Sequence, residues 1–573
     1  MRMRWVVLAA VLGAVGCGKN DSGSSSGSSA GATATGTSGS HGSTTSGGSS
    51  GATTASGSST GTTTSSSSTA SSSTSSTGSS STGSSSTGGS STGGTDPADV
   101  LMEHKDPHRT GLYVDAAFTA SAVPNIHPDT AFDGTFTGEP YAQPLFVSGA
   151  NGATDLVIVG TEENDVIAFN AATGAQVWTQ NLGDPWPLNE LSCGNISTNG
   201  ITGTGVIDSA TRTFYVDALV HNVGHQVFAL DVDTGHVKSG WPVTLDGNAQ
   251  SNGATFDIDP GSGNPLVVQQ ERAALALMGG KLYVPFGGFY GDCGPYHGWV
   301  IAIDPTNASI TGAWATRATG GGIWAPSGIA VEGQGLFVST GNTFVGGINW
   351  SDGEAVFDLG PDASFDYATG NYWAPTNWKA LDDSDIDMSG TGPLIFDLGT
   401  LHAVLAMGKD GKLYLLDRDA LGGISNALVT LQASSNEIIN AAATVADAQG
   451  QMVFYVSNPI TCPTGSGDLG AVRIAPGSPP TITPVWCGDE VENLPGGGSP
   501  IVTSPDGQGS FVVWGVGAGG DNKLRAWDAE TGTPLFDGTG SLTDTVHRFQ
   551  APIVAKGRLY IAADNRLESY VLQ

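Results

Sequence analysis

A glycine-rich loop at residues 287–298 carries side chains capable of acid–base and redox chemistry close together. It reads Gly-Gly-Phe-Tyr-Gly-Asp-Cys-Gly-Pro-Tyr-His-Gly and contains Asp292, Cys293 and His297. An Asp–His pair can perform general acid–base catalysis, because the carboxylate orients the imidazole and stabilises its charged form. The alternative is a loop fastened by a disulfide at Cys293, in which His297 only forms a hydrogen bond. Asp292 and His297 are therefore our candidate catalytic residues.

A second group of interest is the acidic segment Asp-Asp-Ser-Asp-Ile-Asp, which ends at Asp387. The carboxylates of Asp383, Asp385 and Asp387 alternate along the chain, and alternating oxygens can surround a hard cation such as Ca²⁺. The segment is not an EF-hand, because Met388 stands where glycine is required and Leu394 where the bidentate glutamate belongs. We interpret the segment as a solvated acidic loop, with a Ca²⁺ site completed by groups from other loops as the alternative, for which Asp383, Asp385 and Asp387 are the candidate ligands.

Cysteine usage indicates an exported protein. Four cysteines follow Cys17, an even number that is typical of disulfide bonding in secreted chains. Three pairings are possible for four cysteines. Cys462 and Cys487 flank one candidate hairpin, which favours a Cys462–Cys487 bond and leaves Cys193–Cys293 as the second bond, between neighbouring repeats.

From residue 96 onward the sequence predicts β-strands alone. Short apolar runs are bounded by Gly, Asn and Asp, and no helical periodicity of useful length occurs. A unit of the form Ala-x-Asp/Asn-x-x-Thr-Gly, with an aromatic residue beyond it, begins at Ala168, Ala229 and Ala526. Its period is about 60 residues, which is typical of propellers and solenoids.

We interpret residues 96–573 as one all-β domain, an eight-bladed β-propeller, with seven blades as the alternative. The last blade is short of one strand, which residues 129–136 can supply, so that strands from both termini close the ring. Residues 361–389 are the longest insertion expected between blades, and long insertions often bind ligands. The predicted blades are 139–183, 197–246, 271–318, 323–360, 390–431, 441–488, 497–538 and 549–573.

In a propeller, loops that join strands on one face line the mouth of the central channel, where ligands bind. The glycine-rich loop is such a loop, so Tyr296 and His297 are candidate ligand-binding residues. Arg272 precedes the same blade, and Asn195 lies in the preceding one. A Cys193–Cys293 bond would bring these groups together. We therefore expect a protein, a glycan or a small molecule to bind at the channel mouth.

The first ninety-five residues cannot contribute to a core. Residues 1–17 have two arginines, an apolar run and small residues before Cys17, which is the shape of a bacterial secretion signal. The end of this leader resembles a lipobox, so we predict that Cys17 is acylated and that the protein is located at the outer membrane or the cell surface. An ordinary signal peptide and a secreted or periplasmic protein are the alternative. Residues 18–95, almost wholly Ser, Gly, Thr and Ala, predict a disordered tether.

The formal net charge of −32 limits the partners. A surface this negative repels nucleic acid and anionic lipid, so membrane attachment is expected through a lipid anchor only. A cationic or neutral partner fits the charge, and solubility alone would also explain it. His104 and His108 lie in a polar segment before the blades, and we expect both to be exposed in a monomeric protein.

The repeated unit, with its closing Trp, resembles the tryptophan-docking repeat of the quinoprotein alcohol dehydrogenase-like propellers, also called PQQ-like repeats. The resemblance covers about residues 110–573 and implies that the Trp of one blade packs against the turn of the next. Quinoprotein dehydrogenases hold pyrroloquinoline quinone (PQQ) over a Trp floor, under a disulfide of adjacent cysteines, with Ca²⁺ beside a catalytic Asp. Trp324 resembles a floor residue, but the sequence has no adjacent Cys pair.

Two hypotheses follow from the resemblance. The first is a binding or interaction scaffold, since the superfamily includes propellers without quinone, among them a lipid-anchored scaffold of outer-membrane protein assembly. The second is a PQQ- and Ca²⁺-dependent dehydrogenase of alcohols or sugars. The missing pair of adjacent cysteines favours the scaffold, because the dehydrogenases use that pair to cover the quinone. The propeller fold itself does not decide between the two hypotheses.

Overall fold

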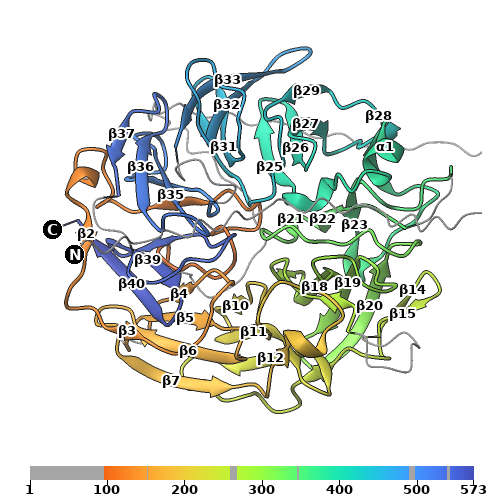
Figure 1. The fold of residues 1–573 in the computed structure, drawn as a ribbon, viewed down its shortest axis with the longest axis horizontal. Helices are drawn as coiled ribbons and strands as arrows, with labels where there is room; N and C mark the ends of the chain where they lie inside the picture. The colour runs from red at the N-terminus through yellow and green to blue at the C-terminus, as the bar shows by residue number, and fades with distance from the viewer. Residues whose placement is uncertain are drawn as a thin grey trace, which may run out of the picture. The chain divides into compact units, whose positions relative to one another are not determined.

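The computed structural model describes residues 96–150, 153–257, 267–344, 348–489, 497–538 and 542–572. These residues form eight mainly antiparallel sheets of four or five strands, arranged as blades around a centre, which confirms the predicted eight-bladed propeller (Figure 1). The predicted leader 1–17, the tether 18–95 and the acylated Cys17 lie outside the described residues. No helix in the described part of the chain is long and apolar enough to span a membrane.

Each blade runs outward from the centre through four consecutive strands, because short apolar runs separated by tight turns favour hairpins between sequence neighbours. The first four blades are β4 (Leu145–Val147), β5 (Leu156–Gly160), β6 (Asp165–Asn170) and β7 (Gln176–Asn181); β10 (Val206–Asp208), β11 (Thr213–Val220), β12 (Gly224–Asp231) and β13 (Val243–Thr244); β17 (Ala276–Met278), β18 (Lys281–Gly288), β19 (Trp299–Asp304) and β20 (Ser309–Ala315); and β21 (Ala330–Glu332), β22 (Gly335–Thr340), β23 (Ala355–Leu359) and β24 (Asn371–Pro375).

The remaining four blades follow the same plan. They are β25 (Leu394–Leu398), β26 (Leu401–Met407), β27 (Lys412–Asp417) and β29 (Val429–Gln432); β30 (Ala443–Asp447), β31 (Gly450–Val456), β32 (Leu469–Ala475) and β33 (Thr481–Gly488); β34 (Ile501–Ser504), β35 (Val512–Val516), β36 (Leu524–Asp528) and β37 (Pro534–Phe536); and β38 (Ile553–Ala555), β39 (Arg558–Ala563) and β40 (Arg566–Val571) with strands from the N-terminal segment.

The ring closes as predicted. The last strand of the chain, β40, pairs antiparallel with β2 (His127–Pro128) and β3 (Gly134–Thr135), and Gly134 lies opposite Leu567. The eighth blade therefore combines strands from both ends of the domain, and no edge of that blade is left open at the seam. The compact unit Ser86–Gln573 contains all eight blades and both disulfides, so we expect it to fold without the residues that precede it.

The fourth blade corrects one predicted boundary. We ended this blade at residue 360, but its outermost strand is β24 (Asn371–Pro375), which lies inside the predicted insertion 361–389. The strand also pairs in parallel with β28 (Gly423–Ser425) of the next blade. The insertion is therefore partly a blade strand, and α1 (Trp378–Asp382) follows it directly. The aromatic run at 371–378 supplies strand packing here, because Trp373 is buried against the fifth blade.

The N-terminal segment 99–115 was predicted to be an exposed lead-in and instead crosses the centre of the ring, where the orange ribbon of Figure 1 runs. Val100 pairs with Phe146 of the first blade, and β1 (Leu112–Val114) pairs in parallel with β34 of the seventh. Between them, carbonyl oxygens of the segment accept backbone hydrogen bonds from Ile207, Val331 and Thr444, each at 2.8 Å. The segment thus joins the inner strands of blades far apart in sequence.

The prediction that His104 is exposed is wrong, whereas 39% of the His108 side chain is exposed. His104 is fully buried, and its Nε2 donates to the carbonyl oxygen of Pro500 at 3.1 Å. Burial lowers the pKa of His104 to about 4, so the imidazole is neutral at physiological pH. His108 lies 2.5 Å from Glu332 of the fourth blade. Both side chains are interblade contacts that sequence spacing alone did not reveal.

The repeated turn fixes the contact between blades as the resemblance implied. Asp231 accepts hydrogen bonds from the backbone N–H of Thr234 at 3.1 Å and from its hydroxyl at 2.9 Å, and Gly235 follows with φ +72°. The indole of Trp178, on the preceding blade, covers Gly235 and donates to a carbonyl of the same turn at 3.0 Å. Trp486 repeats this contact with the seventh blade at 2.8 Å. Gly is required here because a Cβ would overlap the indole.

Gly235→Ala tests this contact, with Gly247→Ala as the matched control. Both glycines have left-handed φ, +72° and +71°, but Gly247 has no atom within 4 Å of a built Cβ, whereas Gly235 faces Trp178. We expect Gly247→Ala to cost about 1 kcal/mol for the backbone conformation alone. Gly235→Ala should cost at least about 2 kcal/mol more, because the indole must move. Urea denaturation followed by circular dichroism measures both, and equal losses would contradict the docking interpretation.

Candidate functional site

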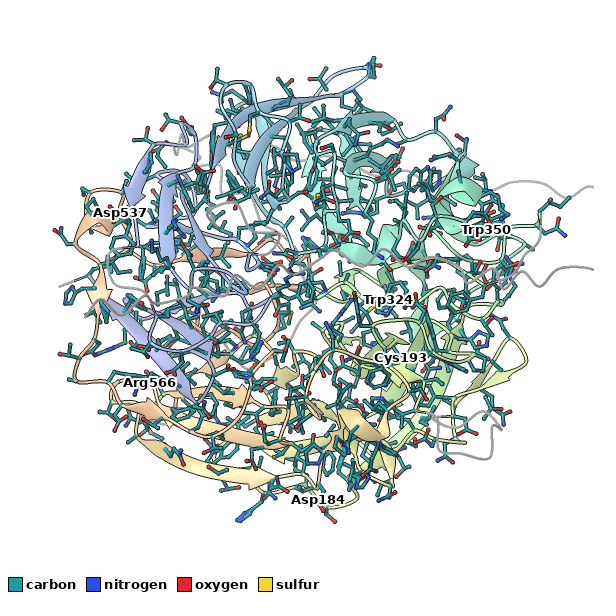
Figure 2. All side chains as sticks on the ribbon, viewed as in Figure 1. Asp184, Cys193, Trp324, Trp350, Asp537 and Arg566 are labelled. Atoms are coloured by element: carbon teal, nitrogen blue, oxygen red, sulfur yellow. A yellow bond between two sulfur atoms is a disulfide. The ribbon has the colours of Figure 1, made fainter. Side chains whose placement is uncertain are left out.

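The predicted disulfides are present. Cys193 is bonded to Cys293, with Cα atoms 6.0 Å apart, and Cys462 is bonded to Cys487, with Cα atoms 5.7 Å apart. The first bond ties the loop that enters the second blade to the glycine-rich loop of the third. In Figure 2, Cys193 and Trp324 lie nearer the centre of the ring than the labelled residues of the rim. The second bond stays within the sixth blade.

The predicted Asp292–His297 pair does not form. Asp292 accepts a hydrogen bond from the hydroxyl of Tyr296 at 2.8 Å, and His297 Nδ1 donates to the carbonyl oxygen of Thr316 at 2.8 Å. Burial raises the pKa of Asp292, against the opposing effect of the Tyr296 hydrogen bond, and burial lowers the pKa of His297. The two side chains therefore have separate partners, and neither orients the other.

Trp324 is held rigidly beside this loop. Only 8% of the residue is exposed, and its Nε1 donates to the carbonyl oxygen of Gly288 at 2.9 Å. Gly287, Gly322 and Gly341 surround the indole so closely that a Cβ at any of them would overlap it. The ring of Tyr296 lies 5.9 Å from the indole. The glycines of this region therefore serve close packing around one aromatic residue.

The acidic segment does not form the candidate calcium cluster. Lys409 forms ion pairs with Asp387 and, at 3.4 Å, with Asp385, whereas Asp383 pairs with Lys379 on α1. Burial opposes the charge of Lys409, but the carboxylate of Asp387 outweighs it and raises the pKa of Lys409. No group of three His, Cys, Asp or Glu side chains suited to a metal ion occurs in the residues that the structure describes. Asp385 and Asp387 thus contact the ammonium group of Lys409, where the sequence analysis considered Ca²⁺.

Arg272 lies between these two groups. Its Nε donates to the carbonyl oxygen of Trp324 at 3.1 Å, and its guanidinium stacks on the ring of Phe549 with 5.1 Å to the centroid. The carboxylates of Asp387 and Asp292 favour its charge from a distance, but burial lowers the pKa of Arg272 to about 10. The structure thus brings together the candidates Arg272, Asp292, Tyr296, Trp324, Asp385 and Asp387. Asn195 remains exposed on its loop.

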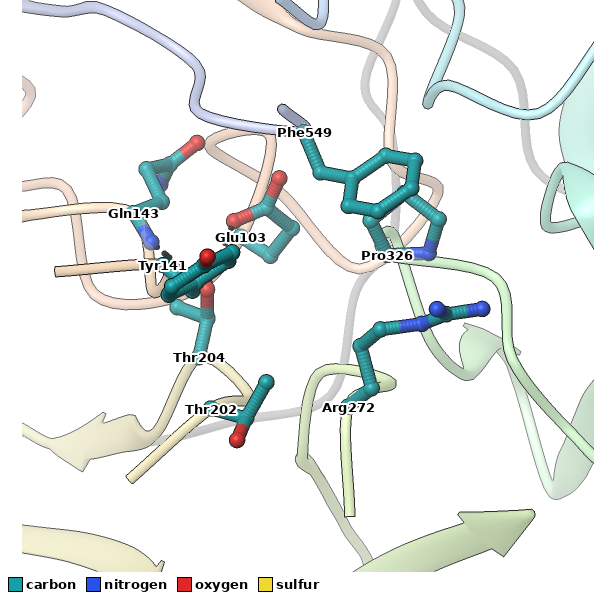
Figure 3. A pocket seen from close by; sticks show the side chains of 8 residues that line it. All are labelled: Glu103, Tyr141, Gln143, Thr202, Thr204, Arg272, Pro326 and Phe549. Carbon is teal, nitrogen blue, oxygen red and sulfur yellow. Dashed lines mark hydrogen bonds between the residues drawn. The ribbon is translucent and has the colours of Figure 1, made fainter. Parts of the chain in front are cut away.

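The guanidinium of Arg272 faces a small cavity near the centre of the ring (Figure 3). The cavity volume is about 10 Å³, the space of one water molecule. Its other lining residues come from the N-terminal segment and from loops that enter the first, second, fourth and eighth blades: Glu103, Tyr141, Gln143, Thr202, Thr204, Pro326 and Phe549. The cavity is therefore assembled from parts of the chain that lie far apart in sequence.

Four buried glutamates around the centre were missed by sequence reasoning. Glu103, Glu162, Glu271 and Glu354 each accept a hydrogen bond on one carboxyl oxygen and leave the other oxygen without a partner. Burial raises the pKa of Glu103 and of Glu162 to about 8, and that of the other two well above its usual range. Burial therefore favours the neutral form of all four carboxyls.

The buried glutamates predict that acid stabilises this protein. The carboxyl of Glu162 has a pKa of about 8 in the folded protein and near 4.5 in the unfolded chain, so below pH 4.5 both states hold the proton and the buried group does not lower the unfolding free energy. Between these two values only the folded state holds the proton, so the unfolding free energy falls as pH rises, until the folded carboxyl ionises near pH 8. The unfolding free energy should therefore fall between about pH 5 and about pH 8.5, by on the order of 3 kcal/mol per group. Glu162→Gln should reduce this slope, because the amide cannot ionise.

Urea unfolding at a series of pH values measures the slope. The matched control is Glu190→Gln, a half-exposed carboxylate beside His221. Parallel curves for the parent and Glu162→Gln would show that Glu162 is ionised in the folded protein.

No protein-family model matches the sequence, and no curated protein does either. Solved structures are similar in fold. The quinohemoprotein alcohol dehydrogenase of Comamonas testosteroni has a TM-score of 0.53 at 16% identity, covering 83% of this chain and 80% of its own. The fold is that of the quinoprotein dehydrogenase propellers. A quinohemoprotein alcohol dehydrogenase of Pseudomonas putida HK5 reaches a TM-score of 0.55 at 12% identity, with coverage of 83% and 80%.

A europium-containing methanol dehydrogenase gives the same result, with a TM-score of 0.53 at 16% identity over 82% of this chain and 90% of its own. At these identities the likeness extends to the arrangement of the blades and not to the chemistry of the site. Whether this quinoprotein-type propeller suits a quinone must be judged from its own residues.

Those residues do not fit PQQ and Ca²⁺ as the family holds them. The disulfide beside the centre joins cysteines 100 residues apart, so the cap of adjacent cysteines is missing. Lys409 already neutralises Asp385 and Asp387, two carboxylates of the candidate Ca²⁺ segment. The cavity at Arg272 has the volume of one water molecule, which a tricyclic quinone far exceeds. Only Trp324 matches the family's pattern.

Proposed function

We propose that this protein is an exported ligand-binding propeller and not a quinone-dependent dehydrogenase. The observation that carries the proposal is Arg272, whose two terminal nitrogens have no acceptor among the described residues although the side chain is half-buried beside a small cavity. A partly desolvated cation is favourable only where a ligand or water meets its donors. The ion pairs of Lys409 and the disulfide between cysteines far apart in sequence also differ from the pattern of the quinoprotein dehydrogenases.

The surroundings of the cavity support a binding role. Tyr290 is 67% exposed on the glycine-rich loop, and Phe344 is 42% exposed on the corresponding loop of the next blade. The ring of Phe344 lies 5.4 Å from Tyr296, which contacts Trp324. Exposed aromatic residues on loops of neighbouring blades are typical of binding surfaces. A protein, glycan or small molecule would meet these rings as it approaches Arg272.

Export and anchoring belong to the same proposal. Two disulfides favour an oxidising compartment, and the leader that ends at Cys17 and the following tether fit a lipoprotein displayed at the outer membrane or cell surface. Cys17→Ser should remove the acylation site. We expect the variant to lose labelling by radioactive palmitate in its native host and to leave the membrane fraction. Retention of label and of membrane association would show that the lipid is not attached at Cys17.

The alternative, a PQQ-dependent dehydrogenase of alcohols or sugars, makes the opposite prediction. The unit 86–573 is titrated with PQQ, with and without Ca²⁺, and tryptophan fluorescence is recorded. We expect no saturable, Ca²⁺-dependent quenching up to about 1 mM quinone, which corresponds to binding no stronger than about −4 kcal/mol.

The control variant is Trp324→Phe. Saturable, Ca²⁺-dependent quenching that this variant loses would establish the dehydrogenase alternative and end the proposal.

A further inference from the structure

We propose that the cavity at Arg272 binds the carboxylate group of a small organic acid or of a ligand that carries one. This inference rests on the proposed binding function and names the chemical class of its ligand. The carboxylate would sit against the edge of the guanidinium, and the remainder of the ligand would extend past Phe549 toward the exposed aromatic residues.

Arg272 is a preorganised cation with free donors. Its side chain is fixed by the 3.1 Å hydrogen bond from Nε to the carbonyl oxygen of Trp324 and by stacking on Phe549. The nearby carboxylates have other partners: Asp387 pairs with Lys409, and Asp292 accepts from Tyr296 at 2.8 Å. Both terminal nitrogens therefore remain available, and a planar guanidinium binds a planar carboxylate through two parallel hydrogen bonds.

The opposite wall supplies further hydrogen-bonding groups. Glu103 is 2% exposed, and its Oε2 accepts from the hydroxyl of Thr204 at 3.0 Å, which leaves Oε1 without a partner. Since burial holds this carboxyl in its neutral form, its proton can be donated to an anion. The hydroxyl of Tyr141 lines the same cavity and has no hydrogen bond to a described residue. An anion would thus meet donors on both sides of the cavity.

Size restricts the class of anion. With space for about one water molecule, the cavity excludes a tetrahedral phosphate or sulfate unless several walls move. A carboxylate also exceeds the space of one water molecule, so its entry requires Phe549, which stacks on the guanidinium, to turn aside. Phe549 has φ +75°, a conformation that is an outlier for a bulky residue and costs of order 1–3 kcal/mol. Such strain is typical of ligand clamps, and it places the ring over the guanidinium.

The experiment compares acetate with acetamide, its neutral isostere, on the unit 86–573 at constant ionic strength and about pH 6, where Glu103 is protonated. Saturation-transfer NMR should show saturable binding of acetate and none of acetamide. Arg272→Gln should weaken acetate binding at least about tenfold, the loss of one charge-assisted contact. The matched control Arg566→Gln, which removes an arginine on β40 paired with Asp544, should bind acetate as the parent does.

Two further measurements keep the test decisive if Arg272→Gln does not fold. Acetate affinity of the parent should fall as pH rises through about 8, because ionised Glu103 repels the anion while Arg272, with its pKa near 10, stays charged. The groups around Glu103 are His104, which is neutral, and Arg109, which keeps its charge. Phe549→Gly should admit benzoate, which the parent excludes, because it relieves the backbone and opens the cavity.

Three results would overturn the inference: equal binding of acetate and acetamide, displacement of acetate by chloride at equal concentration, or acetate binding that is unchanged in Arg272→Gln and at about pH 9. None of these bears on quinone binding, so they leave the proposed binding function in place. Saturable Ca²⁺-dependent PQQ binding would instead end the proposed function and this inference together.

Discussion

The structure depends on one buried guanidinium. Arg109 is fully enclosed, and it donates three hydrogen bonds of 2.9 Å, to the carbonyl oxygens of Glu103, Leu275 and Ile329. A buried cation is tolerated only when its donors are satisfied, so removal of any of these partners would leave an uncompensated charge. Since the three carbonyls belong to the N-terminal segment and to the starts of the third and fourth blades, Arg109 holds that segment across the centre of the ring.

The N-terminal segment fills the centre of the ring. It adds hydrogen bonds to the inner strands of blades that do not otherwise touch, and it carries Glu103 and His104 into the centre. Because water is largely excluded there, the pKa of Glu103 rises and that of His104 falls, and both become neutral hydrogen-bonding groups. The cavity at Arg272 exists because one wall belongs to this segment and the other to the loops of the blades.

The likeness to solved dehydrogenases, at 12–16% identity, is a likeness of blade arrangement. At the centre of this protein, a lysine ammonium contacts the carboxylate of Asp387, and a disulfide joins Cys193 to Cys293, 100 residues further along the chain. The terminal nitrogens of Arg272 have no acceptor among the described residues, and a guanidinium edge of this kind is suited to holding an anion.

The sequence by itself determined the features that depend on local geometry. The Thr-Gly turn with Gly235, the docking of Trp178, the eight blades and the closing strand near Gly134 follow from short-range patterns that each repeat must satisfy. The Cys462–Cys487 bond follows from a hairpin, and the Cys193–Cys293 bond follows because two cysteines then remain. Only the tertiary structure decided the pairing of polar groups at the centre. His297 and Asp292 are neighbours in sequence but bond elsewhere, and the partners of Asp387, Arg272 and Arg109 come from other blades. Loops of several blades and the N-terminal segment converge there, and which donor meets which acceptor is a long-range outcome of ring closure, burial and charge that no local pattern encodes.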